Sequence, residues 1–332
     1  MSHSHYTMGS GSRTARRTLE FGRTYVVRPK GKHQATIVWL HGLGDNGSSW
    51  SQLLESLPLP NIKWICPTAP TRPVALLGGF PCTAWFDAGE LSEEGPDDWE
   101  GLDASAAHIA NFLSTEPPDG ILKSLSFSTF KVGIGGFSMG AAMALYSATA
   151  CALGRYGNGN PYPINLRAVV GLSGWLPGSR GLRNKIQASN EAARRATSLP
   201  ILLSHGTCDD VVPYKFGEKS AHSLNIAGFW NLTFKNYEGI GHYTVPKEMD
   251  ELINFLPLSS NIYNPKTLTV LLVCGTTLLT PSPMHCTTFT MPWTNPPPSH
   301  STLQTDDSNT ATVLACRREI DYVDELVTEM PA

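Results

Sequence analysis

The chain has 332 residues, a formal net charge of −3 at pH 7 and 41% hydrophobic residues. The hydrophobic content is sufficient for a large buried core, whereas the near-neutral charge excludes the basic surface that nucleic-acid binding requires. The sequence shows no His and Cys spacing typical of a metal site and no glycine-rich nucleotide-binding motif. We therefore expect a folded protein that binds no nucleic acid and needs no cofactor.

The first segment, residues 1–20, contains Arg, Ser and His but no apolar stretch, which indicates a disordered leader rather than a secretory signal. Its Arg residues and few acids are also features of transit peptides. Seven cysteines without paired spacing indicate reduced thiols in a cytoplasmic protein. The longest apolar segment of the C-terminal part, residues 268–279, is too short for a membrane span, which needs about 20 residues. Any membrane contact is expected to be transient and at the surface.

An apolar run at residues 35–38 precedes the sequence His-Gly-Leu-Gly-Asp at residues 41–45. The run predicts a buried strand, and the glycines allow the following loop to turn sharply and to approach a ligand closely. Loops in this position supply backbone N–H groups that stabilise a developing negative charge. We predict that the N–H of Leu43 is such a donor. The alternative is a plain glycine-rich loop.

A long connection, residues 67–100, separates an expected strand at residues 62–66 from an expected helix at residues 101–112. Connections of this length inside a compact domain usually cover or line a binding site. Its apolar side chains are expected to line a hydrophobic pocket, with a tryptophan from a later segment on the opposite wall. The residues predicted to bind substrate are Leu76, Leu77, Trp85 and Trp175. The alternative for each is ordinary packing.

The sequence Gly-Phe-Ser-Met-Gly at residues 136–140 lies between an apolar run and an Ala-rich helical pattern. A G-x-S-x-G motif between a strand and a helix is typical of a nucleophile elbow, where a tight turn exposes the serine Oγ. We predict that Ser138 is a nucleophile and that the N–H of Met139 is the second donor to an oxyanion. The alternative is a glycine-rich connection with a capping serine.

A nucleophilic serine needs a base that removes its proton and an acid that orients the base. Strands are expected at residues 200–204 and 232–237, and the loops after them contain Asp209 and His242. The order Ser138, Asp209, His242 is that of the α/β-hydrolase fold, in which each residue follows a different strand of one sheet. We therefore predict an α/β protein with a mostly parallel sheet flanked by helices and a single catalytic domain.

Other residues compete for these roles. Asp210 is an alternative acid, because spacing alone does not separate two adjacent aspartates. His205 ends an expected strand and His222 lies in a helical pattern, so both are more easily explained as structural histidines. His285 and His300 lie in a segment rich in Pro, Thr and Ser, with no sheet to hold them.

Six segments of the chain resemble motifs of the acyl-protein thioesterase/carboxylesterase family and occur in the same order. Their sequences and spacing are most similar to those of its plant branch. The segments are residues 41–45, 67–74, 84–87, 136–140, 205–213 and 237–242. The resemblance spans residues 24–256 and implies a serine hydrolase that cleaves acyl thioesters and esters through an acyl-enzyme intermediate. It also implies Asp209 as the acid and Leu43 as the first oxyanion donor. Acylated proteins or small acyl esters would be the substrates, in keeping with the predicted apolar pocket.

The hydrolase domain is expected at residues 21–256. Residues 121–130 look like an insertion before the elbow strand, and residues 257–332 like an appended, mostly disordered tail. Two other functions stay open on the same fold: a carboxylesterase for small molecules without protein substrates, and a non-catalytic ligand receptor. The oligomeric state and the acyl chain length are not predicted.

Overall fold

A computed structural model describes residues 19–89, 95–116 and 131–256 of the chain. The predicted insertion at residues 121–130, the predicted tail at residues 257–332 and nearly all of the predicted leader lie outside this part. The chain divides after Thr244 into two compact units. The first unit contains every element described below except the last helix.

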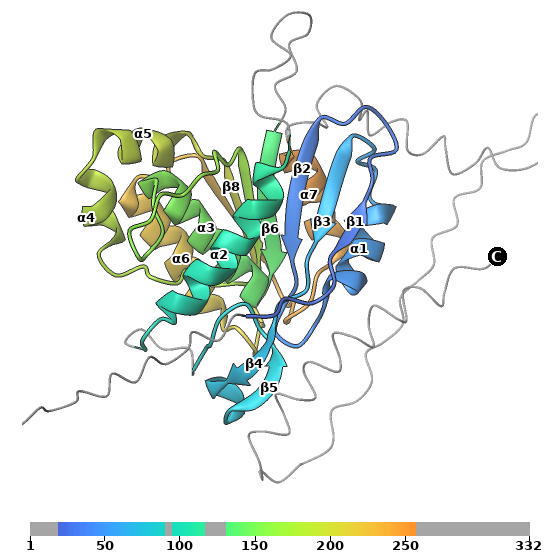
Figure 1. Cartoon of the computed structure of the whole chain (residues 1–332), viewed down its shortest axis with the longest axis horizontal. Helices are drawn as coiled ribbons and strands as arrows, with labels where there is room; N and C mark the ends of the chain where they lie inside the picture. Colours follow the sequence, from blue (N-terminus) through green and yellow to red (C-terminus); the bar gives the residue numbers. More distant parts are fainter. Residues whose placement is uncertain (1–18, 90–94, 117–130, 257–332) are drawn as a thin grey trace, which may run out of the picture. The chain divides into compact units, whose positions relative to one another are not determined.

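A seven-stranded sheet forms the centre of the first unit (Figure 1), in the order β1-β3-β2-β6-β7-β8-β9. β1 runs antiparallel to β3, and all the other neighbouring strands are parallel. The strands are β1 (Tyr25–Val27), β2 (Ala35–Leu40), β3 (Ile62–Cys66), β6 (Lys131–Phe137), β7 (Ala168–Leu172), β8 (Ile201–Gly206) and β9 (Leu232–Tyr237). The predicted mostly parallel α/β sheet is therefore confirmed.

Helices cover both faces of this sheet because parallel strands need long crossover connections, which are almost always right-handed. The chain leaves β2 toward β3 in one direction and returns past β2 to β6, so the helices of these two crossovers lie on opposite faces. α1 (Gly47–Ser56) packs on β1 and β3, whereas α2 (Trp99–Ser114), α3 (Met139–Leu153) and α6 (Tyr214–Ala227) lie in front of the sheet in Figure 1. Two shorter helices, α4 (Leu182–Gln187) and α5 (Asn190–Ser198), lie beside α3 and α6.

The connection between β3 and α2 differs from the long loop that the sequence predicts. It contains a separate two-stranded hairpin, β4 (Thr71–Val74) and β5 (Phe80–Thr83), with a 3₁₀ turn at Ala75–Leu77 between the strands. β4 contains a proline and has only β5 as its neighbour, which agrees with the confinement of proline to strand edges. The apolar composition of this connection alone does not reveal the pairing.

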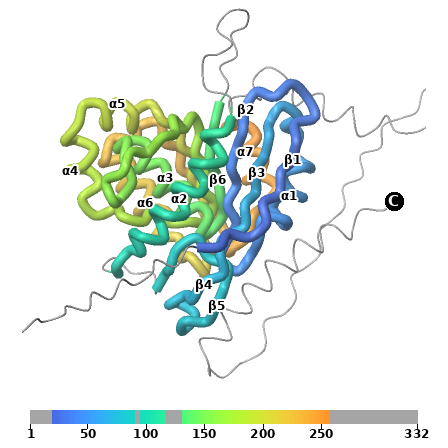
Figure 2. Tube along the Cα trace, viewed as in Figure 1, coloured from blue at the N-terminus to red at the C-terminus, as the bar shows by residue number. Residues whose placement is uncertain are grey.

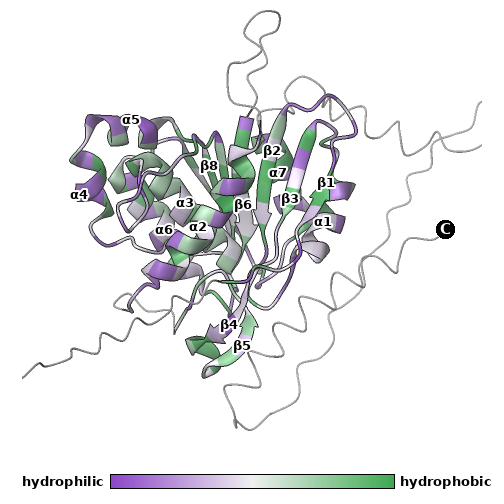
Figure 3. Cartoon of the chain, in the orientation of Figure 1, coloured by the Kyte–Doolittle hydropathy of each residue, from purple (hydrophilic) through white to green (hydrophobic). Residues whose placement is uncertain are grey.

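The core of the first unit lies between the sheet and α3. Every residue of β2 and β7 is buried, and α3 is buried from Met139 to Ala152. Figure 3 shows this distribution. Strands at the centre of the sheet are green and hydrophobic, whereas α5 at the outer side is purple and hydrophilic. The many alanines of α3 let the helix approach the sheet closely. This dense packing holds the start of α3, and Ser138 directly before it, in a fixed position.

The described part of the second unit contains the helix α7 (Pro246–Phe255). It starts with proline at its first turn, where the missing N–H has no intrahelical partner in any case, and it buries Met249, Leu252 and Ile253. Each helix in the described part of the chain is too short or too polar to cross a lipid bilayer.

The return of the chain past β2 creates a switch point in strand order, and ligands of open α/β sheets bind at such points beyond the carboxyl ends of the strands. Figure 2 shows blue β2 beside green β6, although these segments are far apart in sequence. Leu40 pairs with Gly136 in this register. The loops after β2 and β6 therefore begin side by side.

Candidate active site

Ser138 stands at a strained turn between β6 and α3. Its backbone has φ 55° and ψ −121°, a combination that non-glycine residues seldom adopt and that is often found at functional sites. The turn is held by two hydrogen bonds: the Ser138 N–H donates to the Leu172 carbonyl at 2.9 Å, and the Ala142 N–H donates to the Ser138 carbonyl at 3.1 Å. The serine side chain is thus lifted out of the sheet at the carboxyl end of β6.

Gly140 brings the loop after β2 against this turn. A Cβ at Gly140 would lie 2.1 Å from the Leu40 carbonyl oxygen and 2.7 Å from that of His41. Met139 is the first residue of α3, so its N–H has no partner within the helix. The two predicted oxyanion donors, Leu43 and Met139, thus belong to segments in contact at one end of the sheet.

We expect Gly140→Ala to lower the free energy of unfolding by about 1–3 kcal/mol, because the added methyl group overlaps backbone that cannot easily move. Denaturant unfolding measures this change. Gly89→Ala is the control, since a Cβ there meets no atom of the described residues within 4 Å. Equal stability of the two variants would contradict the close approach of the two segments.

His41 fixes the shape of the loop that carries Leu43. Its Nε2 accepts a hydrogen bond from the Ala69 N–H at 3.0 Å, so the proton is on Nδ1, which donates to the Gly42 carbonyl at 2.6 Å. Burial holds the pKa of this imidazole below its usual range. The Trp85 indole N–H donates to the His41 carbonyl at 2.9 Å. A neutral histidine therefore clamps the loop to the chain after β3.

The loops after β8 and β9 are joined by backbone hydrogen bonds. The Thr207 N–H donates to the Tyr237 carbonyl at 2.9 Å, and the Cys208 N–H donates to the Ile240 carbonyl at 2.9 Å. These bonds extend the parallel pairing of the two strands beyond their carboxyl ends. The residues after them, Asp209 and His242, are thereby brought to neighbouring positions.

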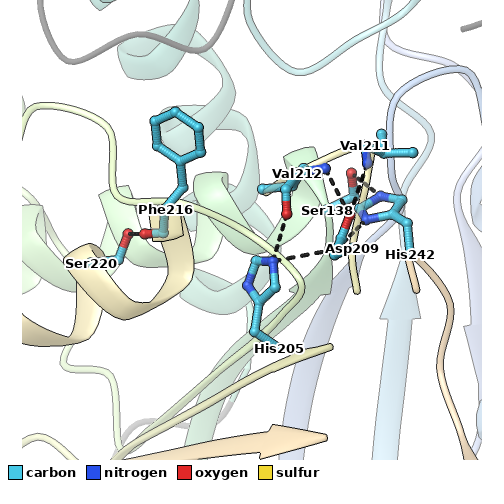
Figure 4. A network of polar contacts seen from close by, with 8 residues as sticks. All are labelled: Ser138, His205, Asp209, Val211, Val212, Phe216, Ser220 and His242. Atoms are coloured by element: carbon cyan, nitrogen blue, oxygen red, sulfur yellow. Dashed lines mark hydrogen bonds and ion pairs between the residues drawn. The ribbon is translucent and has the colours of Figure 1, made fainter. Parts of the chain in front are cut away.

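Ser138, His242 and Asp209 form a continuous chain of hydrogen bonds (Figure 4). His242 Nε2 lies 2.9 Å from Ser138 Oγ, and His242 Nδ1 lies 2.7 Å from Asp209 Oδ2. All three side chains are buried, with 6–8% of each residue exposed. Because the carboxylate only accepts, Nδ1 carries the proton and Nε2 is free to accept the serine proton. This geometry suits a serine nucleophile with an imidazole base.

The Asp209 carboxylate is stabilised in its charged form. Burial by itself would raise its pKa, but hydrogen bonds from His205, His242 and the Val212 N–H outweigh burial and lower the pKa to about 2. Its Oδ1 accepts from the N–H groups of Val211 and Val212 at 3.0 and 2.8 Å. Asp209 is therefore ionised at any pH at which the protein would work.

The competing candidates lie elsewhere. Asp210 is exposed to solvent, and so is His222 on α6. His285 and His300 lie outside the described residues. His205, by contrast, is buried against Asp209, a contact that the sequence analysis did not foresee.

The four residues predicted to bind substrate are placed differently from one another. Trp85 is completely buried beneath the hairpin connection, Leu77 is partly buried, and Leu76 is 39% exposed. Only Trp175, among these four, lines a cavity of about 640 Å³ in the described part of the chain. Trp175 also packs edge-on against Phe86, with ring centroids 6.0 Å apart.

The cavity is lined by both apolar and charged side chains, among them Phe86, Leu176, Phe216, Asp97, Arg180 and Lys219. Burial raises the pKa of Asp97, although a hydrogen bond from the Gly178 N–H at 3.0 Å and nearby Arg180 oppose this. A cavity of this size is within the usual range for small-molecule sites.

An ion pair near this cavity was not predicted. Arg72 of β4 donates to Asp98 Oδ2 at 2.8 Å, and the same oxygen accepts from the Asp87 N–H at 2.8 Å. Asp98 also caps α2 by accepting from the Gly101 N–H. The pair ties the hairpin connection to the start of α2. In the sequence, the only indication of this contact was the position of Asp98 just before a helical pattern, which is typical of a helix cap.

Comparison with known proteins agrees with this geometry. Residues 22–260 match the family model described as phospholipase/carboxylesterase. The acyl-protein thioesterase 1 homolog 1 of Dictyostelium discoideum is 32% identical over 239 residues, which cover 70% of this chain and 94% of that protein.

Solved structures show the same likeness. The crystal structure of Zea mays acyl-protein thioesterase 2 is 67% identical, with a TM-score of 0.67, and the match covers 71% of this chain and 97% of that one. Arabidopsis thaliana SOBER1 is 29% identical with a TM-score of 0.52, over 67% of this chain and 96% of that one. The resemblance seen in the six sequence segments is confirmed, and the chain belongs to the phospholipase/carboxylesterase family of α/β-hydrolases.

Proposed function

We propose that this serine hydrolase cleaves acyl thioesters and esters with Ser138 as nucleophile, His242 as base and Asp209 as the acid that orients it. The observation that carries the proposal is the unbroken hydrogen-bond chain from Ser138 Oγ through His242 to Asp209. The similarity of the chain to acyl-protein thioesterases favours the removal of palmitoyl groups from proteins as its activity. Acylated proteins are therefore the proposed substrates, and small acyl esters are also expected to react.

The geometry suggests the following steps. Ser138 Oγ attacks the acyl carbonyl carbon while its proton passes to His242 Nε2, and the negative charge on the former carbonyl oxygen is stabilised by the N–H groups of Leu43 and Met139. Collapse of this intermediate expels the thiolate or alkoxide, which takes the proton from His242. Water, activated in turn by His242, then releases the acid from the acyl-serine.

The acyl chain is proposed to lie along Trp175 and the apolar part of the 640 Å³ cavity. Leu76 and Leu77, between the two strands of the hairpin, would contact the acyl chain from that side. Trp85 would not contact the chain and would instead hold His41 in place through its indole N–H.

We also propose a cytoplasmic location. The described cysteines, Cys66, Cys82, Cys151 and Cys208, are all free thiols, which suits a reducing compartment.

We expect kcat/KM to rise with acyl chain length, by at most about 4-fold per added methylene that becomes buried. The measurement compares matched ester and thioester substrates from acetyl to palmitoyl. A preference for acetyl and butyryl esters would instead identify a carboxylesterase for small molecules. Tight ligand binding with negligible turnover would identify a receptor.

A further inference from the structure

His205 occupies an unusual position at the carboxyl end of β8. The side chain is buried, with 1% of the residue exposed, and its Nε2 points toward two oxygen atoms at once. The Val212 carbonyl oxygen lies 2.7 Å from Nε2, and Asp209 Oδ2 lies 3.3 Å from it. Because both oxygens only accept hydrogen bonds, Nε2 carries the proton.

Asp209 Oδ2 is thus the meeting point of two histidines. His242 donates to it from one side at 2.7 Å, and His205 Nε2 approaches it from the other at 3.3 Å. The second carboxylate oxygen is held by backbone N–H groups of its own loop. The hydrogen bond from His205 is also the largest of the effects that lower the pKa of Asp209 against burial.

The helix α6 packs closely against the His205 ring. A Cβ at Gly217 of α6 would lie 2.2 Å from His205 Nδ1, so only glycine allows the helix to approach this closely. The Tyr214 ring packs edge-on, with its centroid 6.0 Å from that of His205. Among the described residues, the titratable groups Asp209 and Tyr214 lie against the ring, whereas the charged residues near Gly217 on α6, Lys215, Glu218 and Lys219, are exposed.

We propose that His205 is a positioning residue of the active site. It shares its Nε2 proton between the Val212 carbonyl and Asp209 Oδ2, and so fixes the orientation of the carboxylate toward His242. His205 does not touch the substrate and acts only through Asp209. This inference rests on the proposed function of the Ser138, His242 and Asp209 chain.

The test compares His205→Leu, which removes the donor, with His205→Gln, whose amide N–H can reach the position of Nε2. In the Leu variant we expect kcat to fall on the order of 10–100-fold with little change in KM, as for other small displacements of catalytic groups. Without the His205 donor, Asp209 interacts more strongly with protonated His242. The acidic limb of the pH–kcat/KM profile should therefore move upward by about half to one pH unit.

His205→Gln is expected to recover most of kcat and the wild-type pH limb. His222→Leu, on the exposed side of α6, is the control and should match the wild type. A Leu variant with a lower melting temperature but unchanged kcat and pH limb would show that His205 is only structural, and would overturn the proposal.

A second readout needs no turnover. The low-field ¹H NMR resonance of the proton between His242 Nδ1 and Asp209 should shift in His205→Leu and return toward its wild-type position in His205→Gln. Absence of Ser138-dependent hydrolysis in the wild type would refute the proposed function, and this resonance would then decide the role of His205 separately. An unshifted resonance in the Leu variant would contradict the positioning role.

Discussion

Ser138→Ala is expected to lower kcat for a long-chain acyl thioester by roughly 10⁴–10⁶-fold, because the variant has no nucleophile to form the acyl-enzyme. KM should change little, since the Oγ atom contributes little to binding of the acyl chain. The fold should persist, because the turn at Ser138 is held by backbone hydrogen bonds rather than by the hydroxyl. Single-turnover kinetics with an active-site titrant measures the loss.

Ser147→Ala is the matched control for this variant. Ser147 is a buried serine of α3, the helix that follows Ser138, and its hydroxyl donates to the Met143 carbonyl within that helix. Its removal should alter the melting temperature but leave kcat within a few-fold of the wild type. A serine-directed phosphonate should label the wild type and Ser147→Ala once per chain and should not label Ser138→Ala. Labelling of Ser138→Ala would assign the nucleophile to another residue.

Asp209→Asn is expected to lower kcat by about 10³–10⁴-fold, because an amide no longer selects the tautomer with the proton on His242 Nδ1. It also removes the negative charge that stabilises the imidazolium. The charged carboxylate has a strongly lowered pKa in the folded protein, of about 2, so the wild type retains this charge across the working pH range. A pH–rate profile of both proteins measures the effect.

The neighbouring Asp210 provides the control. Its side chain is exposed and Asp210→Asn makes the same change of charge one residue away, so kcat should stay within about 2-fold of the wild type. If Asp210→Asn and Asp209→Asn lost activity equally, the assignment of the acid would be wrong.

Much of the fold was predictable from local patterns. The strands at Ile62–Cys66 and Leu232–Tyr237 have the bounds that their composition indicates, and the strand before Ser138 continues to Phe137, inside the G-x-S-x-G motif. The hairpin β4–β5 was not predictable, because each of its strands contains a proline and neither shows a regular alternation of buried and exposed residues. The substrate-binding role of Trp85 was inferred from its apolar character, whereas the structure places this side chain at 0% exposure beneath the loop.

The sequence by itself determined the family, the fold class and the order of the residues Ser138, Asp209 and His242, because these depend on short motifs and on which strand each motif follows. Spacing alone did not separate Asp209 from Asp210, and the family resemblance implied Asp209. The tertiary structure gives the physical reason, since the Asp209 carboxylate meets His242, which lies on a loop distant in sequence. Only the tertiary structure revealed the position of His205. His205 contacts Asp209 because the end of β8, the loop after it and Gly217 of α6 pack against one another. Neither the periodicity of the sequence nor a motif predicts this packing.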